Sequence, residues 1–406
     1  MLTLLRNANL YTPEPAGIHD VLIAGGEIVA LSRDRLPVDE RLAEIVDLEG
    51  RIVAPGLIDN HAHVLGGGGG LGFSSRAPEL QTSQVVRHGI TTVIGMLGFD
   101  ATSKSMAALV AKTKAFREDG LSAYCLTGAT LEHPVPTLTG RIRTDIAFID
   151  EIIGVGELSI SELGYGFDSF GKGAQYVAEA ATAGLLAGRL ARKGGYACLQ
   201  VPPYRETVLK PMFEVIDRTG LPITQFVPSH VNQTPEYMSD AGNWGKRGGW
   251  VDVGANYSPD NNYSRAIEPA QAVCRLRDAG VPLERILVSS DGNGAPPKEE
   301  RGEGRPKVAN YMPLGALAGV LRRLRLQHGM PLEQALLPFT ANVARATGLA
   351  RKGRIASGMD ADLVVFDDDA LQIRDVYCRG RRMVADGRTE GTGMFDAVLG
   401  REFAAA

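Results

Sequence analysis

The stretch Val53-Ala-Pro-Gly-Leu-Ile-Asp-Asn-His-Ala-His-Val-Leu65 runs directly into five glycines, Gly66 to Gly70. Residues 57–64 are predicted to form a short apolar strand, and because side chains alternate faces along a strand, His61 and His63 should point the same way. A lone histidine here would more often be a core residue beside a flexible loop. Two imidazoles on one strand face, followed by glycines that indicate a sharp turn or a close backbone approach, favour metal ligands.

Length and composition are those of a globular enzyme. The 406 residues suffice for one large barrel and a smaller domain, with 44% hydrophobic and 22% charged residues. The 43 Lys and Arg nearly balance the 47 Asp and Glu, so no basic excess indicates nucleic acid or an anionic membrane, and a small-molecule substrate is expected. No stretch reaches the roughly 18 apolar residues of a membrane span, and the start of the chain lacks the pattern of an export signal.

The cysteines are scattered without paired spacing, at Cys125, Cys198, Cys274 and Cys378, three of them in apolar surroundings. Such spacing favours free, buried thiols over disulfides, and therefore a cytoplasmic protein.

Both ends of the chain carry short strand-like segments, at residues 2–5, 20–24, 27–31, 353–366 and 373–384. Gly25-Gly26 is a hairpin signal between two of them. Because such strands are marginal alone, residues 1–55 and 351–406 are predicted to pair into one small β-sandwich domain.

Between these ends, apolar strands alternate with amphipathic helical stretches. Eight strands are predicted, at residues 57–64, 91–97, 122–127, 153–159, 196–201, 223–231, 250–256 and 286–290. This alternation predicts a (β/α)8 barrel of the TIM type over residues 56–350. A doubly wound open sheet is the alternative, but no Gly-x-Gly-x-x-Gly motif opens a helix after the first strand.

Catalytic groups of such barrels lie at the carboxyl ends of the strands. The polar residues at those ends are His61, His63, Glu157, Gln200, His230 and Asp291. Each alone has a structural explanation, since Glu157 suits a surface, Asp291 a turn, and His230 a buried core. Together they predict a centre for Zn2+, or for Mn2+ or Fe2+. His133, after the third strand, is a weaker candidate for proton transfer or substrate contact.

Several longer phrases carry a family resemblance. They are residues 55–69, Leu126-Thr-Gly-Ala129, residues 145–155, Pro228-Ser-His-Val-Asn232, Ser289-Ser-Asp-Gly-Asn-Gly294 and residues 358–365. On these the chain resembles the amidohydrolase superfamily, and within it the isoaspartyl dipeptidase family, over nearly its whole length. The resemblance implies a barrel beside a composite β domain, one or two metal ions, amide hydrolysis by metal-activated water, and a homo-oligomer.

The resemblance also implies roles for single residues. His61 and His63 match ligands of a first metal, with Asp291 as a further ligand and the catalytic proton shuttle, and His230 matches a ligand of the second metal. Glu157 stands where the family's type member has a carboxylated lysine that bridges both metals, and Gln200 stands where the family has its remaining histidine.

The substrate pocket departs from the family pattern. Neutral residues stand where the dipeptidases use a glutamate, arginines, a serine and a tyrosine, namely at Gly70, Gly164, Gln233, Ala295 and Thr130. Arg141 lies on a nearby loop. These departures predict a small peptide-like, N-acyl or cyclic amide substrate in an altered pocket. A one-metal deaminase or lyase-like enzyme acting on a specialised metabolite, and a non-catalytic ligand-binding barrel, are the alternatives.

Overall fold

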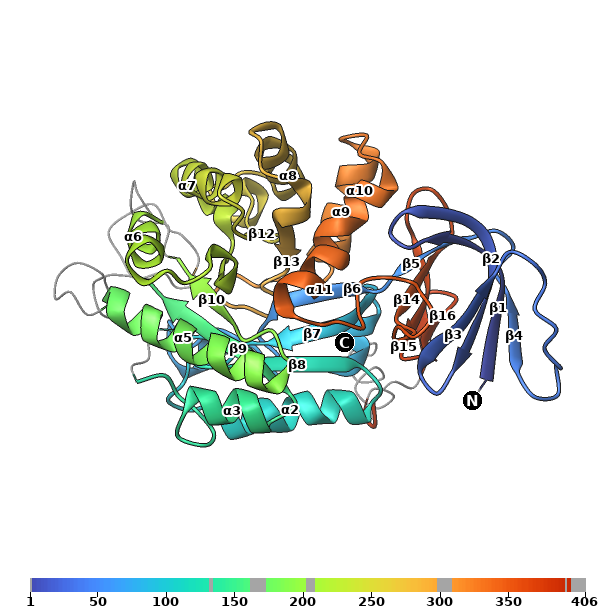
Figure 1. The fold of residues 1–406 in the computed structure, drawn as a ribbon, viewed down its shortest axis with the longest axis horizontal. Coiled ribbons are helices and arrows are strands. Elements are labelled where there is room, and N and C mark those ends of the chain that lie inside the picture. The colour runs from blue at the N-terminus through green and yellow to red at the C-terminus, as the bar shows by residue number, and fades with distance from the viewer. Residues whose placement is uncertain are drawn as a thin grey trace.

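The structure, a computed structural model, describes residues 2–130, 134–160, 173–201, 209–297, 309–390 and 393–395. Two parts lie side by side: a barrel surrounded by helices, and a β domain that contains strands from both ends of the chain (Figure 1). This arrangement confirms the predicted fold class. The boundaries at residues 55 and 350 stay a prediction.

Parallel strands form the barrel. A six-stranded sheet contains β6 (Leu57–Ala62), β7 (Ile90–Gly95), β8 (Ser122–Thr127), β9 (Ile152–Ser159), β10 (Tyr196–Gln200) and β11 (Phe226–Pro228), while β12 (Val251–Gly254) pairs with β13 (Ile286–Ser289). The backbone nitrogen of His63 donates to the carbonyl of Gly292 at 2.8 Å, which joins the segment after β13 to the first strand. Each strand overlaps one of the eight predicted stretches, and β11 is shorter than predicted because residues 223–225 and 231–233 form 3-10 turns on either side of it.

Helices pack around these strands, with α2, α3 and α5 along the outer side of β8 and β9 (Figure 1). Their bounds are α1 (Thr82–Val86), α2 (Met106–Glu118), α3 (Ile142–Phe148), α5 (Gly173–Ala191), α6 (Lys210–Thr219), α7 (Pro235–Lys246), α8 (Pro269–Asp278), α9 (Ala316–Leu326), α10 (Leu332–Leu336) and α11 (Ala341–Thr347). In α2 the Ser105 side chain caps the first turn, and Leu109, Val110 and Phe116 face the core. This apolar spacing is that of an amphipathic helix, as expected for the stretches between the predicted strands.

The β domain is a nine-stranded sheet with its own core. Its strands are β1 (Leu2–Tyr11), β2 (Pro15–Ala24), β3 (Glu27–Ser32), β4 (Glu44–Asp47), β5 (Ile52–Pro55), β14 (Leu363–Phe366), β15 (Ile373–Cys378), β16 (Arg381–Ala385) and β17 (Arg388–Thr389). The antiparallel pairing of β5 with β14 joins the two chain ends and places Val53 opposite Val365. The predicted pairing of the two ends is therefore confirmed.

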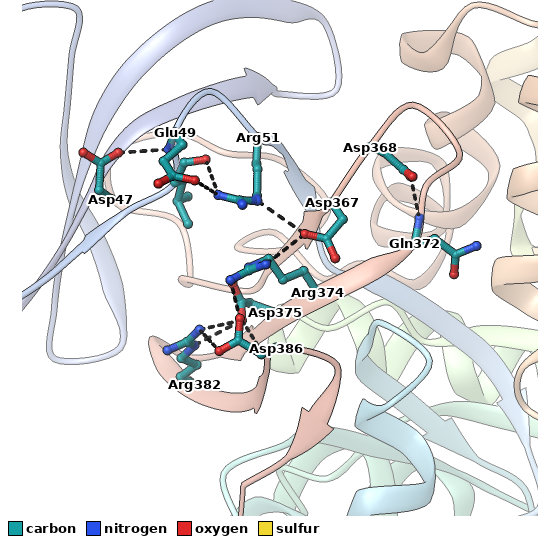
Figure 2. Close-up of polar contacts among 11 residues, drawn as sticks. Asp47, Glu49, Arg51, Asp367, Asp368, Gln372, Arg374, Asp375, Arg382 and Asp386 are labelled. Carbon is teal, nitrogen blue, oxygen red and sulfur yellow. Dashed lines mark hydrogen bonds and ion pairs between the residues drawn. The ribbon is translucent and has the colours of Figure 1, made fainter.

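Ion pairs on this domain connect the same two ends (Figure 2). Asp367 accepts from Nε of Arg51 at 3.3 Å and from Nη1 of Arg374 at 3.1 Å. Beside them Arg382 binds the buried Asp375 at 2.7 Å. The Arg51–Asp367 pair joins the chain after β14 to the loop before β5, and as an exposed pair it contributes little to stability.

A buried cation lies at the junction between barrel and β domain. Nζ of Lys352 lies 2.6 Å from the Ser122 hydroxyl in β8, 2.7 Å from Asp360 and 2.5 Å from Asp362. Its side chain is 3% exposed, so all three donors of the ammonium are used inside the protein.

The four cysteines are free, and Cys125, Cys198 and Cys378 are buried, as predicted. Among the described residues no helix has the length and apolar character to cross a membrane.

Candidate metal centre

His61, His63 and Asp291 converge at the carboxyl end of the barrel. One ligand atom from each lies within 4.8 Å of the others. Nε2 of His63 is 2.9 Å from Oδ1 of Asp291, and Nε2 of His61 is 3.8 Å from the same oxygen. All three side chains are buried or nearly so, so the cluster presents two imidazole nitrogens and one carboxylate oxygen to a shared, water-poor point.

Glu157 adds a second carboxylate at the end of β9. Its Oε1 lies 3.1 Å from Nε2 of His61, and its Oε2 accepts a hydrogen bond from the Thr130 hydroxyl at 2.9 Å. Thr130, a predicted substrate contact, is thereby engaged with the carboxylate. Glu157 therefore lies beside His61, and its role as a bridge between two metals stays a prediction.

His230 follows β11 and lies over His61, with ring centroids 4.5 Å apart. It adopts a left-handed backbone conformation with φ of 55°, which turns the chain at the barrel rim. Among the described residues neither of its buried ring nitrogens has a hydrogen-bond partner. Burial lowers the pKa of His230 to about 3, so the imidazole is neutral and able to bind a metal.

The remaining predicted site residues differ in where they lie relative to the cluster. Two of them have a buried polar atom without a hydrogen-bond partner within the described part of the chain. These atoms are Oε1 of Gln200 and Nε2 of Gln233. Arg141 is exposed before α3 and lines a surface cavity of about 350 Å3 with Tyr176 and Glu179, and no contact of the described residues joins it to the cluster. His133 and Gly164 lie outside the described residues.

Charges within the cluster determine its protonation. Burial alone would raise the pKa of Glu157, but the neighbouring His61 lowers it to about 2. For Asp291, burial is likewise outweighed by the surrounding histidines, which lower its pKa. Both carboxylates are therefore ionised at neutral pH, as metal ligation requires.

Two further buried carboxylates hold the backbone under the cluster. Asp59 accepts from the backbone nitrogens of Ser290 at 3.0 Å and His61 at 3.4 Å. Asp252 accepts from the Ser289 hydroxyl at 2.7 Å, and burial raises its pKa to about 6. The Asp59 bonds join β6 to the end of β13, and the Asp252 bond joins β12 to β13, so the ligands that follow β6 and β13 keep their separation.

The glycine loop, residues 66–70, passes very close to neighbouring backbone, as its sequence predicts. A Cβ on Gly66 would lie 1.8 Å from the carbonyl oxygen of Ala77, and one on Gly67 would lie 2.8 Å from Cα of Gly294. In the loop after β7, a Cβ on Gly98 would lie 2.7 Å from Nδ1 of His63. Only glycine permits these approaches to the segment that carries the ligands.

Sequence reasoning missed Tyr257. Its hydroxyl donates to Oδ2 of Asp291 at 2.8 Å, and its ring stacks on His230 with centroids 4.8 Å apart. Its position shortly after β12, at the same rim as the ligands, was the available signal.

Comparison with known proteins identifies the family. The crystal structure of the beta-aspartyl dipeptidase from Fervidobacterium islandicum AW-1, in complex with beta-Asp-Leu dipeptide, is 30% identical, with a TM-score of 0.86 over 96% of this chain and 99% of that one. The chain belongs to the beta-aspartyl dipeptidase family. A family model described as Amidohydrolase family also matches this chain, at residues 44–114 and 298–389.

More distant relatives of the beta-aspartyl dipeptidase family also match. Imidazolonepropionase from Chromobacterium violaceum is 27% identical and covers 90% of this chain and 91% of that protein. An adenine deaminase from Halalkalibacterium halodurans is 30% identical over 34% of this chain. The chain spans only 23% to 51% of the length of the first three curated relatives that it matches.

The residues present fit the metal that members of this superfamily typically contain. The convergent ligand atoms of His61, His63 and Asp291, the unbonded ring nitrogens of His230 and the ionised Glu157 form a nitrogen and oxygen donor set. Buried polar atoms without a partner are costly unless they bind something, and a divalent cation would bind one nitrogen of each histidine together with the carboxylate oxygens.

Proposed function

We propose that this beta-aspartyl dipeptidase relative is a metal-dependent hydrolase that cleaves the C–N bond of a small peptide-like, N-acyl or cyclic amide. The observation that carries the proposal is the meeting of His61, His63 and Asp291 ligand atoms within 4.8 Å at the carboxyl end of the barrel. Family membership supports the same chemistry.

The chain offers ligands for two ions. His61, His63 and Asp291 would hold the first, while His230, Glu157 and the Gln200 oxygen would serve the second. Imidazole and carboxylate ligands suit Zn2+, and also Mn2+ or Fe2+. When bound, such a metal lowers the pKa of water and polarises the substrate carbonyl.

Asp291 is the group that moves the proton. Its ionised carboxylate would accept a proton from the attacking water and later deliver it to the leaving nitrogen. Neutral His230 and buried Glu157 would keep the surroundings fixed while this happens. Because the cluster is buried, little bulk water competes with the substrate there.

The pocket favours a substrate with fewer free charges than an isoaspartyl dipeptide. Gly70, Gln233 and Ala295 are neutral at positions where the dipeptidases use charged or hydroxyl-bearing residues, and Thr130 already bonds to Glu157. A lost bidentate arginine at a carboxylate costs several kcal/mol, on the order of 2–5. Weak turnover of free dipeptides is therefore expected. By analogy with the family, the enzyme is proposed to form a homo-oligomer.

Gln200 supports a second candidate function. An amide oxygen binds Zn2+ less well than the histidine it replaces, which favours a centre with one ion. A one-metal enzyme of the deaminase type would act on an amidine or imine instead of an amide, and one of the matching relatives is an adenine deaminase.

Metal analysis separates these functions. Protein purified without added metal is compared with Glu157→Ala and with Glu118→Ala, an exposed control in α2. Two ions per chain, one of them lost only in Glu157→Ala, together with hydrolysis of an amide panel that includes beta-Asp-Leu, supports the first function. One ion, unaffected by Glu157→Ala, with turnover of amidines alone, supports the second. Metal without any turnover would leave a ligand-binding barrel.

A further inference from the structure

Tyr257 contacts both sides of the metal centre. Its hydroxyl donates to Oδ2 of Asp291 at 2.8 Å, and its ring stacks on His230 at 4.8 Å with 23° between the planes. The side chain is buried, and the Tyr263 ring packs against it at 4.6 Å. One residue thus touches the proton-transfer carboxylate and the histidine assigned to the second ion.

The chain around Tyr257 is shaped for this contact. A Cβ on Gly254 would lie 2.4 Å from Cδ2 of Tyr257 and 3.0 Å from Cδ2 of His230, so only glycine allows both rings to approach. The Asn232 side chain donates to the carbonyls of Gly254 and Tyr257 at 3.2 and 2.9 Å and accepts from the Gly254 nitrogen at 2.8 Å. The loop therefore has little freedom to move Tyr257 away.

The hydrogen bond from Tyr257 gives the two carboxylate oxygens of Asp291 different partners. Oδ1 faces His63 at 2.9 Å, while Oδ2 is occupied by the phenol. The backbone on either side is held separately, because Asn256 donates to the Ser290 carbonyl at 2.6 Å and the His63 nitrogen donates to Gly292. Rotation of the carboxylate is the freedom that remains, and the phenol restricts it.

We propose that Tyr257 is a positioning residue of the metal centre. Its hydroxyl orients Asp291 so that Oδ1 is the ligand oxygen, and its ring keeps His230 against His61. Outer partners of metal ligands act in this way, and their removal typically weakens metal binding by about 10- to 100-fold. This inference rests on the proposed function of the site as a metal centre.

The test measures Zn2+ dissociation constants by competition with a chromophoric chelator. Tyr257→Phe keeps the stacked ring and removes only the hydroxyl, so Zn2+ should bind about 10- to 100-fold more weakly. Tyr196→Phe is the matched control, because Tyr196 is buried in the barrel and its hydroxyl has no hydrogen-bond partner among the described residues. The control should bind Zn2+ within about twofold of wild type.

A double-mutant cycle shows whether the effect passes through Asp291. In an Asp291→Asn background, Tyr257→Phe should change the Zn2+ affinity by less than about twofold, since the oriented carboxylate is gone. The visible spectrum of Co2+-loaded Tyr257→Phe should also differ from that of wild type. A merely structural tyrosine would instead lower the unfolding temperature and leave that spectrum unchanged.

The outcomes separate the inference from the proposed function. Wild-type protein that binds no Zn2+ overturns the proposed metal centre and the role of Tyr257 with it. Wild type that binds Zn2+, with Tyr257→Phe equal to it in affinity and spectrum, overturns only the role of Tyr257. Fully additive effects of Tyr257→Phe and Asp291→Asn on the Zn2+ affinity would also overturn only the role of Tyr257.

Discussion

Nε2 of His63 lies 2.9 Å from Oδ1 of Asp291, although one residue follows the first strand of the barrel and the other follows the last. Barrel closure produces this contact, because the hydrogen bond from the His63 backbone to Gly292 brings the two segments together. The same closure places His61 within 3.8 Å of the carboxylate. The core of the proposed site is thus a product of the seam between β6 and β13.

Asp291→Asn should reduce turnover far more than it alters folding. The amide keeps the shape of the side chain but cannot accept the proton, and loss of a general acid and base typically costs about 100- to 10,000-fold in rate. Steady-state kinetics on the best substrate of the amide panel measures the change. Asp278→Asn, at the exposed end of α8, should retain wild-type kcat, and an Asp291→Asn variant that also does so would remove Asp291 from the mechanism.

Gln200→His should strengthen binding of a second ion. Imidazole is a better ligand for Zn2+ than an amide, and the Gln200 oxygen is buried without a hydrogen-bond partner in the described structure. We expect the second dissociation constant to fall by roughly tenfold or more, measured by calorimetric Zn2+ titration. The exposed Gln327→His should leave it unchanged. An unchanged value in Gln200→His would place residue 200 outside the ligand set.

Lys352→Met should destabilise the junction between barrel and β domain. It leaves the carboxylates of Asp360 and Asp362 without their ammonium partner, and breaking a buried ion pair costs about 3–5 kcal/mol. Urea unfolding measures the loss. Lys210→Met, exposed at the start of α6, is the control and should change stability by less than about 0.5 kcal/mol. Equal urea midpoints for Lys352→Met and Lys210→Met would contradict a stabilising role of Lys352 at this junction.

His88 should make stability depend on pH. Burial, helped by Arg87 and Arg322, lowers its pKa to about 4 from an ordinary 6.5. The unfolded chain then binds a proton more readily than the folded one. The contribution of His88 is therefore complete above about pH 6.5 and is lost as pH falls toward 4. Allowing for the partial exposure of the ring, this loss is about 2 kcal/mol.

Comparison of His88→Gln with wild type isolates the contribution of His88 to the pH dependence of stability. The free energy of unfolding of the variant should fall less between pH 7 and 4, by about the same 2 kcal/mol. The exposed His328→Gln should follow the wild-type curve. Parallel curves for wild type and His88→Gln would show that His88 titrates alike in the folded and unfolded states.

Local patterns account for most of what could be predicted. The eight barrel strands were recognised because each is a short apolar run that ends in a turn, and the helical stretches between them because apolar residues recur there at helical spacing. Strand β4 and the short β17 were not predicted, because their few residues show no alternation strong enough to identify them. The sequence placed Arg141, just before α3, on a loop near the site. The chain position of Arg141 gave no information on where its side chain points.

The sequence by itself determined the fold class and the ligand candidates, since strand periodicity, glycine spacing and the residues at strand ends are local properties. Tertiary structure alone decided which of those candidates meet. It joined Asp291 to His63 across the barrel seam, engaged Thr130 with Glu157, and brought Tyr257 onto both Asp291 and His230. Such contacts depend on barrel closure and on loop paths several strands apart, which no local pattern records.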